Sequence, residues 1–172
     1  MPRYAIGVDI GGTNTKLALV DEGRQVHRRD ALPTPHHAQP KSMVDAIIRA
    51  VLAFRGQAAS AETPITGIGL AVPHFSEGEL WVQRHAQNLP ALEGFALYPP
   101  LRAALGPAIA IINDVSAAGI AEYRYGRGRG CERMLLMAIG TGIATSLVTR
   151  EQGLVRYSWD SMGDTGQIIV DP

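Results

Sequence analysis

Cysteine, net charge and long apolar runs are all scarce in this 172-residue sequence. Cys131 is the single cysteine, which excludes an internal disulfide framework or a multi-cysteine zinc site within these residues and is typical of a reducing compartment. Sixteen basic residues balance sixteen acidic ones, so no global field attracts nucleic acid or an anionic membrane. No apolar run approaches the roughly 20 residues of a membrane helix, and the N-terminus lacks a signal-peptide pattern. We therefore expect a soluble, cytoplasmic protein with neither a nucleic-acid nor a membrane partner.

Apolar and turn-forming residues are plentiful by contrast. Hydrophobic residues make up 46% of the chain, which is long enough to bury a core. Nineteen glycines and eleven prolines divide it into short segments, as expected for strands joined by turns. Apolar alternation predicts strands over residues 4–10, 15–20, 25–32, 65–72 and 108–112, and helical spacing predicts helices over 42–56, 100–105 and 115–125. Ser42 and Asp45 have the spacing of a capping box at the start of the first helix. The sequence therefore predicts an α/β fold.

An internal repeat is the most informative feature. The segments VDIGGTNTKLALVDEGRQV and MAIGTGIATSLVTREQGLV both run strand, glycine turn, strand, glycine turn, strand, so that Ile10 matches Ile139 and Gly23 matches Gly153. The repeat predicts a first lobe over residues 1–125 and the incomplete start of a duplicated second lobe over 126–172. A half-built sheet leaves faces and edges exposed. We therefore expect the chain to be a fragment of a longer protein, or to need a partner that covers this sheet.

The two glycine turns of the repeat are candidate phosphate-binding loops. Each lies between two predicted strands, where absent Cβ atoms let backbone N–H groups approach an anion and hydroxyls add donors. Their residues are Gly11, Gly12 and Thr13 in the first turn and Gly140, Thr141 and Gly142 in the second. An ordinary hairpin turn is the alternative for either turn alone, but recurrence at matching positions favours the phosphate-binding interpretation.

Three polar residues at strand ends are candidates for metal binding and catalysis. Asp9 ends the first strand beside the first turn, where a carboxylate can hold a hydrated Mg²⁺ or simply stabilise the turn. Asn113 and Asp114 end an apolar strand and begin a helix, a position that suits either a helix N-cap or a general base. In the second case Asp114 takes the proton from an attacking hydroxyl, and Asn113 orients that hydroxyl.

At these residues the sequence resembles the ROK family of the actin-like ATPase superfamily. DIGGTNTKLALVD resembles its phosphate-1 motif, and MLLMAIGTGIATSLV its phosphate-2 motif. NLPALEGFAL resembles the segment before the substrate strand, IINDVSAAGIAEYRYGRGRG the sugar-binding and catalytic-base motif, and MGDTGQIIVDP the Glu-x-Gly-His region. The resemblance implies a ribonuclease-H-like lobe with a mixed sheet. It also implies ATP-dependent phosphorylation of a hexose-type hydroxyl, with Asp114 as the base.

The resemblance also implies the remaining site residues. Two groups would hold ATP and its Mg²⁺: Asp9, Gly11, Gly12, Thr13, Asn14 and Lys16 in the first motif, and Gly140, Thr141 and Gly142 in the second. Sugar contacts would come from Asn88, Asn113, Asp114, Asp164, Gln167 and His74. The full-length protein would be a homodimer.

Three positions depart from the family pattern. Asp164 stands where the family usually has Glu, Gln167 where it has a sugar- and zinc-binding His, and His74 where a Gly commonly approaches the sugar. Because an amide is a poor zinc ligand compared with imidazole, we expect no structural zinc in this chain. His74 suggests an altered pocket, suited to a different sugar.

Two other functions remain open at this point. One is a noncatalytic sugar sensor or regulator, and the other is an actin-like ATPase without a sugar substrate. Two local features have plain interpretations as well. The arginine- and glycine-containing stretch 124–133 is expected to be a flexible connection between lobes rather than an RNA-binding patch. Trp81 is expected to pack in the core or on the surface rather than stack on a sugar ring.

Overall fold

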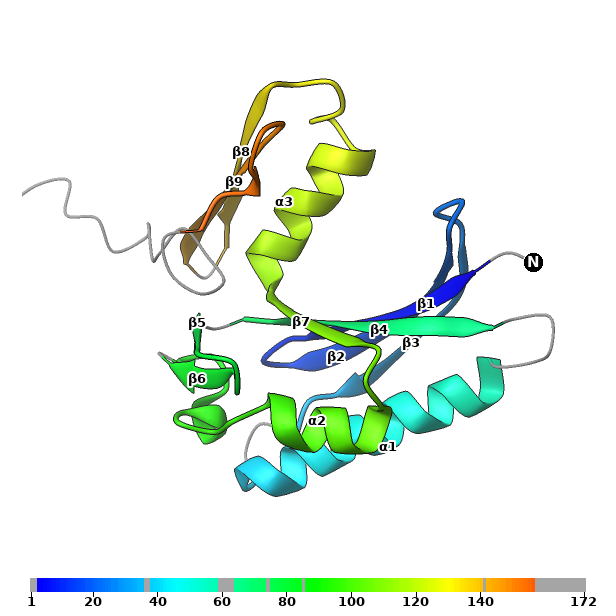
Figure 1. The fold of residues 1–172 in the computed structure, drawn as a ribbon. Helices are drawn as coiled ribbons and strands as arrows, with labels where there is room; N and C mark the ends of the chain where they lie inside the picture. The colour runs from blue at the N-terminus through cyan, green and yellow to red at the C-terminus, as the bar shows by residue number, and fades with distance from the viewer. Residues whose placement is uncertain are drawn as a thin grey trace, which may run out of the picture. The chain divides into compact units, whose positions relative to one another are not determined.

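The computed structural model describes residues 3–35, 38–58, 64–73, 75–84, 86–140 and 142–156. The chain forms two compact units, residues 1–112 and 113–172. The sequence predicted the boundary after residue 125, whereas the structure groups the helix that begins at Asp114 with the second unit. The helix groups with the second unit because it packs directly against the strands that follow it (Figure 1).

The first unit is built on a five-stranded mixed sheet. Its strands are β1 (Tyr4–Ile10), β2 (Asn14–Asp21), β3 (Val26–Pro33), β4 (Ile65–Val72) and β7 (Ile109–Asn113), in the order β3-β2-β1-β4-β7. β1, β2 and β3 form an antiparallel meander, and β4 joins β1 in parallel. All five predicted strands are therefore confirmed. Since β1 and β4 are parallel, their carboxyl ends lie at the same edge of the sheet.

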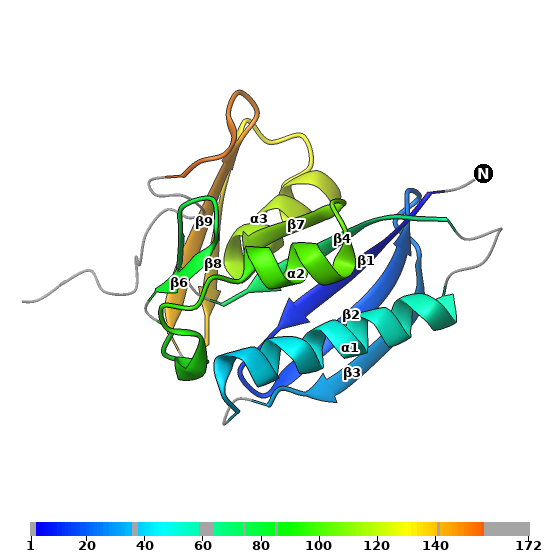
Figure 2. The same cartoon turned by 60° about the horizontal axis from the view of Figure 1, so that its bottom comes forward.

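Two helices cover one face of this sheet, α1 (Pro40–Ala58) and α2 (Tyr98–Leu105) (Figure 2). Burial alternates along β1, where Ile6, Val8 and Ile10 face the core while Ala5, Gly7 and Asp9 do not. The α1 side chains that meet them are Met43, Val44, Ile47, Ile48, Val51 and Phe54. Burial of each such side chain stabilises the fold by about 1.5–3 kcal/mol. This apolar contact holds the strand ends in place.

The start of α1 differs from the predicted capping box. The helix begins at Pro40, whose fixed φ and missing N–H suit a first turn. Asp45 pairs with Lys41 one turn earlier, at 2.6 Å between Nζ and Oδ2. The carboxylate is therefore used within the helix as an i,i+4 ion pair.

A short hairpin between β4 and α2 was not predicted. β5 (Phe75–Glu77) pairs with β6 (Val82–Arg84), and the 3-10 turn η1 (Pro90–Leu92) follows. Strands of three residues are too short to produce a recognisable alternation. The buried position of β6 is moreover occupied by a polar residue, Gln83. Trp81 is half-buried against the core cluster, as expected for a packing role.

The second unit repeats the meander of the first. α3 (Asp114–Tyr125) is followed by β8 (Arg133–Ile139), β9 (Ile143–Thr149) and β10 (Gly153–Leu154), in the sheet order β10-β9-β8. α3 lies on one face of this sheet (Figure 1). On the face opposite α3, the side chains of four residues have between 45% and 74% of their surface exposed: Leu135, Met137, Ile139 and Ile143. These four apolar side chains are therefore open to solvent among the described residues.

The stretch between α3 and β8 is an ordered series of turns instead of the expected flexible connection. The Glu122 carbonyl accepts hydrogen bonds from the N–H groups of Gly126 (2.9 Å) and Gly128 (3.1 Å). The Glu122 carboxylate accepts another from the N–H of Arg127 (3.1 Å), and Tyr123 Oη donates to the Cys131 carbonyl (2.9 Å). The backbone of this connection is therefore fastened to the last turn of α3.

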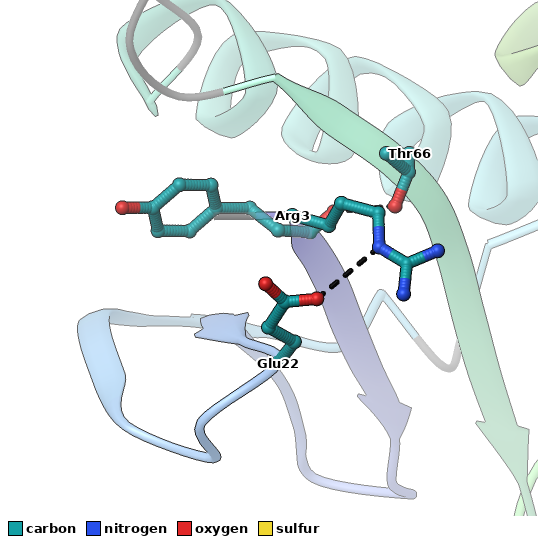
Figure 3. Close-up of polar contacts among 4 residues, drawn as sticks. Arg3, Glu22 and Thr66 are labelled. Carbon is teal, nitrogen blue, oxygen red and sulfur yellow. Dashed lines mark hydrogen bonds and ion pairs between the residues drawn. The ribbon is translucent and has the colours of Figure 1, made fainter. Parts of the chain in front are cut away.

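The amino end of β1 is held by polar contacts. Arg3 Nε donates to Glu22 Oε2 at 3.2 Å, and Thr66 Oγ1 donates to the Tyr4 carbonyl at 3.0 Å (Figure 3). These residues lie at the opposite end of β1 from the glycine turn, so they serve the sheet rather than a ligand. Among the helices of the described residues, none combines the length and the apolar character needed to cross a membrane.

Candidate functional site

The first glycine turn is a tight reversal between β1 and β2. The Gly11 N–H donates to the Asn14 carbonyl at 3.1 Å, which closes the turn. A Cβ at Gly11 would lie 2.9 Å from that same carbonyl oxygen, closer than side chains tolerate. Glycine is therefore required here by the close approach of backbone to backbone. Thr13 and Asn14 are exposed at the tip.

The turn is supported from β3 by a residue that sequence reasoning missed. Thr34, 3% exposed, donates from Oγ1 to the Gly11 carbonyl at 2.7 Å, and its N–H donates to the Thr13 carbonyl at 2.9 Å. Its hydroxyl also lies 2.9 Å from Oγ1 of Thr15, which is fully buried. Since Thr34 has one hydroxyl hydrogen, Thr15 is the donor in that pair. No sequence pattern marks Thr34, which stands between two prolines.

Asn88 and Gly12, which the sequence assigned to different ligands, lie side by side in the first unit. A Cβ at Gly12 would be 3.1 Å from the Asn88 carbonyl oxygen and 3.6 Å from its Cβ. Asn88 is exposed, while the neighbouring Leu89 is fully buried and anchors the segment. The structure therefore brings together the glycine turn and the segment predicted to contact sugar.

Asp9 and Lys16 face each other across β1 and β2. They are register partners, and Lys16 Nζ lies 3.9 Å from Asp9 Oδ2. Their side chains keep 53% and 69% of their surface exposed, respectively. A pair so open to water is weakly bound and can exchange partners. Both charges are thus available to a ligand beside the turn.

Asn113 and Asp114 form the start of α3. Asn113, 8% exposed, has extended backbone angles and accepts the Ser116 N–H on Oδ1 at 3.0 Å, as an N-cap does. The N-cap interpretation of Asn113 is thus confirmed. The N–H groups of its Nδ2 remain as donors for a ligand. Asp114 is half-buried in the first turn, where Oδ1 accepts the Val115 N–H at 2.7 Å. The positive end of the helix dipole lies at this carboxylate.

The second glycine turn closes the β8–β9 hairpin. The Gly140 N–H donates to the Gly142 carbonyl at 2.9 Å. A Cβ at either glycine would meet nothing within 4 Å, and both residues are exposed. The turn therefore presents open backbone on its outer side. This openness fits either interpretation made from the sequence, a hairpin turn or a loop that binds phosphate.

Four predicted site residues lie outside the described residues: His74, Thr141, Asp164 and Gln167. Within the described ranges, no three side chains of His, Cys, Asp and Glu gather at a distance suited to a metal ion. Asp9 alone stands beside the first turn. Mg²⁺ is commonly held by one or two carboxylates, waters and substrate phosphates, so a single carboxylate at this position fits that ion.

Comparison with known proteins gives consistent matches. A family model described as the ROK family matches residues 5–154. The bifunctional enzyme NanE/NanK of Brucella melitensis is 32% identical over 165 residues, which cover 96% of this chain and 30% of that protein. The chain spans less than a third of the length of this relative.

Two crystal structures resemble the fold. One is the inorganic polyphosphate/ATP-glucomannokinase from Arthrobacter sp. strain KM, with a TM-score of 0.77, 30% identity, and coverage of 98% of this chain and 65% of that one. The other is a ROK family glucokinase from Streptomyces griseus in complex with glucose and AMPPNP, with a TM-score of 0.81, 25% identity, and coverage of 98% and 51%. This chain spans less than two thirds of either.

Proposed function

Because this chain belongs to the ROK family and has the α/β fold of its sugar kinases, we propose that it forms the N-terminal part of a carbohydrate kinase. The reaction is transfer of the γ-phosphoryl group of ATP to a hydroxyl of a hexose-type sugar. The observation that carries this proposal is the contact of Gly12 with Asn88. It joins a turn suited to phosphate with a segment suited to sugar inside a single compact unit.

The phosphate donor is bound by the two glycine turns. Gly11, Gly12, Thr13 and Asn14 offer backbone and side-chain donors, and Lys16 offers a positive charge. The composition of the second turn, Gly140, Thr141 and Gly142, provides backbone and hydroxyl donors for the same kind of ligand. The AMPPNP in the Streptomyces griseus glucokinase supports ATP as the donor. Asp9 would hold Mg²⁺ through water, and the ion would neutralise phosphate charge. Lys16 is free to turn from Asp9 to the phosphates because their ion pair is exposed.

Asp114 is the general base. Its carboxylate removes the proton from the attacking sugar hydroxyl as the oxygen forms a bond to the γ-phosphorus and the bond to the ADP oxygen breaks. The hydrogen bond from Val115 N–H occupies one face of Oδ1 and keeps the carboxylate at the helix start. Asn113 donates from Nδ2 to the sugar and is itself fixed by Ser116. Asn88, His74, Asp164 and Gln167 complete the sugar contacts in this proposal.

The test is the substitution Asp114→Asn in the full-length protein, because this chain by itself is expected to be inactive. The substitution keeps the shape of the side chain and removes the base. We expect kcat for hexose phosphorylation to fall by about 100-fold or more while the sugar Kd measured by calorimetry stays nearly unchanged. Asp30→Asn is a matched control, because Asp30 Oδ1 also accepts the N–H of the next residue, at 2.8 Å, but lies on β3. Near-normal turnover by the Asp114 variant would remove this residue as the base.

Thermal unfolding with a panel of hexoses, with and without MgATP, separates the kinase from the other two functions. A ligand that binds the native state raises its stability. A kinase is stabilised by both sugar and nucleotide and forms sugar phosphate. Stabilisation by sugar without turnover would indicate a sensor, and stabilisation by nucleotide alone would indicate an ATPase. The homodimer implied by the family resemblance is tested by light scattering of the same protein.

A further inference from the structure

The β5–β6 hairpin contains two unfavourable features within three residues. Trp81 has a φ of +53°, a left-handed backbone conformation that residues other than glycine rarely adopt. Gln83 is fully buried, and its Oε1 has no hydrogen-bond partner among the described residues. A buried acceptor without a donor destabilises the fold. Violations of local rules concentrate at functional sites, where the surrounding structure maintains them.

The amide of Gln83 ties the hairpin together from within. Nε2 donates to Ser76 Oγ at 2.7 Å and to the Trp81 carbonyl at 3.1 Å, so it joins β5 to the strained turn. These two acceptors determine the orientation of the amide, and Oε1 is left on the side without a donor. The unsatisfied oxygen is therefore a consequence of the two bonds made by the nitrogen.

The backbone of Gln83 closes the loop that follows. Its N–H donates to the Phe95 carbonyl at 3.0 Å, and its carbonyl accepts the Gly94 N–H at 2.9 Å. Chain segments eleven and twelve residues later in the sequence are thus held at β6. These two bonds bring both ends of the loop together at Gln83.

Asn88 lies within that loop, against the glycine turn. Inside the loop, the Ala86 N–H donates to Glu93 Oε2 at 2.8 Å, and Leu89 and Leu92 are buried at 0% and 1% exposure. These contacts make the loop compact. The loop is joined to the β5–β6 hairpin at Gln83, and Leu89 and Leu92 anchor it in the core of the first unit.

We infer that Gln83 is a positioning residue, which holds the loop of residues 84–94 so that Asn88 stays against Gly12. It touches neither substrate nor reacting atoms in this role. The inference rests on the proposed function, since Asn88 is there a sugar contact and Gly12 a phosphate contact. Gln83 thereby sets the separation between the phosphate-binding turn and the sugar-binding loop.

The test is the pair of substitutions Gln83→Met and Ser76→Ala in one protein. The methionine fills a similar volume, removes the unsatisfied oxygen and loses the two amide bonds, and the alanine avoids leaving the Ser76 hydroxyl unpaired. We expect the KM for the sugar to rise by about tenfold or more, kcat to change by less than about threefold, and the thermal midpoint to stay equal or rise. Amide exchange of Leu89 and Phe95 should become faster while exchange in β1 and β2 does not.

Two controls keep the result specific. Ser76→Ala alone reports the loss of the serine, and Gln57→Met removes an exposed glutamine that bonds Arg28 on another surface. An unchanged sugar KM, or faster exchange throughout the first unit together with a lower midpoint, would overturn the inference. A wild-type protein that phosphorylates no hexose would instead overturn the proposed function, and the exchange of Leu89 would still decide whether Gln83 holds the loop.

Discussion

Thr34 Oγ1 donates a hydrogen bond of 2.7 Å to the carbonyl oxygen of Gly11, and through it β3 fixes a turn that belongs to β1 and β2. The same hydroxyl accepts from buried Thr15, so one side chain joins the turn to the core. A glycine turn alone would be free to change conformation. Here the turn that we propose to bind phosphate is held in place before any ligand arrives, which lowers the ordering cost of binding.

Replacing Thr34 with valine should disturb this support without changing the volume of the side chain. The Gly11 carbonyl and the buried Thr15 hydroxyl would each lose a partner, and we expect a loss of about 2 kcal/mol in the free energy of unfolding. The KM for MgATP should rise more than the KM for sugar. Urea unfolding and steady-state kinetics measure both effects. Thr34→Ser, which keeps the hydroxyl, should behave nearly as wild type, and equal losses in both variants would contradict this explanation.

Replacing Gly12 with alanine should push the glycine turn and Asn88 apart. The new Cβ would lie 3.1 Å from the Asn88 carbonyl oxygen, so one of the two segments must shift by a few tenths of an ångström. Because small misplacements of reacting groups are costly, we expect kcat/KM to fall by about tenfold or more with little change in stability. The matched control is Gly7→Ala, where a Cβ on β1 meets nothing within 4 Å. Equal activity of the two variants would show that the contact is unimportant.

Replacing Gly119 with alanine should destabilise the second unit. A Cβ at this position of α3 would lie 2.8 Å from the Cβ of Ser146 on β9, so the helix could not approach the sheet as it does. Overpacking of this kind costs about 1–3 kcal/mol. Ser146→Gly in the same protein should restore much of the loss in thermal unfolding. Ser146→Ala alone should be neutral or stabilising, because its buried hydroxyl has no partner among the described residues.

Stability should depend on the ionisation of Asp21 in acid. A hydrogen bond from His27 (2.7 Å), followed by one from the Gln25 N–H, holds the pKa of Asp21 below its ordinary value. A depressed pKa stabilises the fold above the unfolded pKa of about 3.9, and the effect is lost as the pH falls through the lower folded value. Asp21→Asn should therefore lower the urea midpoint at pH 6, and the difference from wild type should shrink below pH 4. A difference independent of pH would exclude this linkage.

Regular patterns explain how much of the fold could be predicted. β1 and β2 alternate buried and exposed side chains over seven and eight residues, and α1 repeats its apolar residues over several turns, so both types of element were recognised. β5 and β6 have three residues each and place Gln83 where an apolar residue is expected. The grouping of α3 with the second unit depends on how closely Gly119 approaches Ser146, which no local pattern reports.

In the candidate site, too, residues in local motifs could be predicted, whereas residues that act through distant contacts could not. The glycine turns, Asp9, Asn113 and Asp114 could be predicted because they belong to motifs at strand ends, and the ROK family suggested by those motifs is confirmed. Thr34 and Gln83 belong to no motif. Their importance comes from hydrogen bonds to residues that are 23 and 12 positions away, Gly11 and Phe95. The first bond comes from the Thr34 side chain and the second from the Gln83 backbone, and such long-range contacts become visible only in three dimensions.

The hydrogen bonds that hold the segment between α3 and β8 should affect its sensitivity to proteases. Trypsin cleaves after basic residues, and Arg124, Arg127, Arg129 and Arg133 stand close together on exposed positions. A protease must pull a stretch of backbone out of its hydrogen bonds before it can cut. Because Glu122 and Tyr123 hold this backbone, the richest cluster of trypsin sites in the chain should resist brief digestion, and α3 should remain covalently joined to β8.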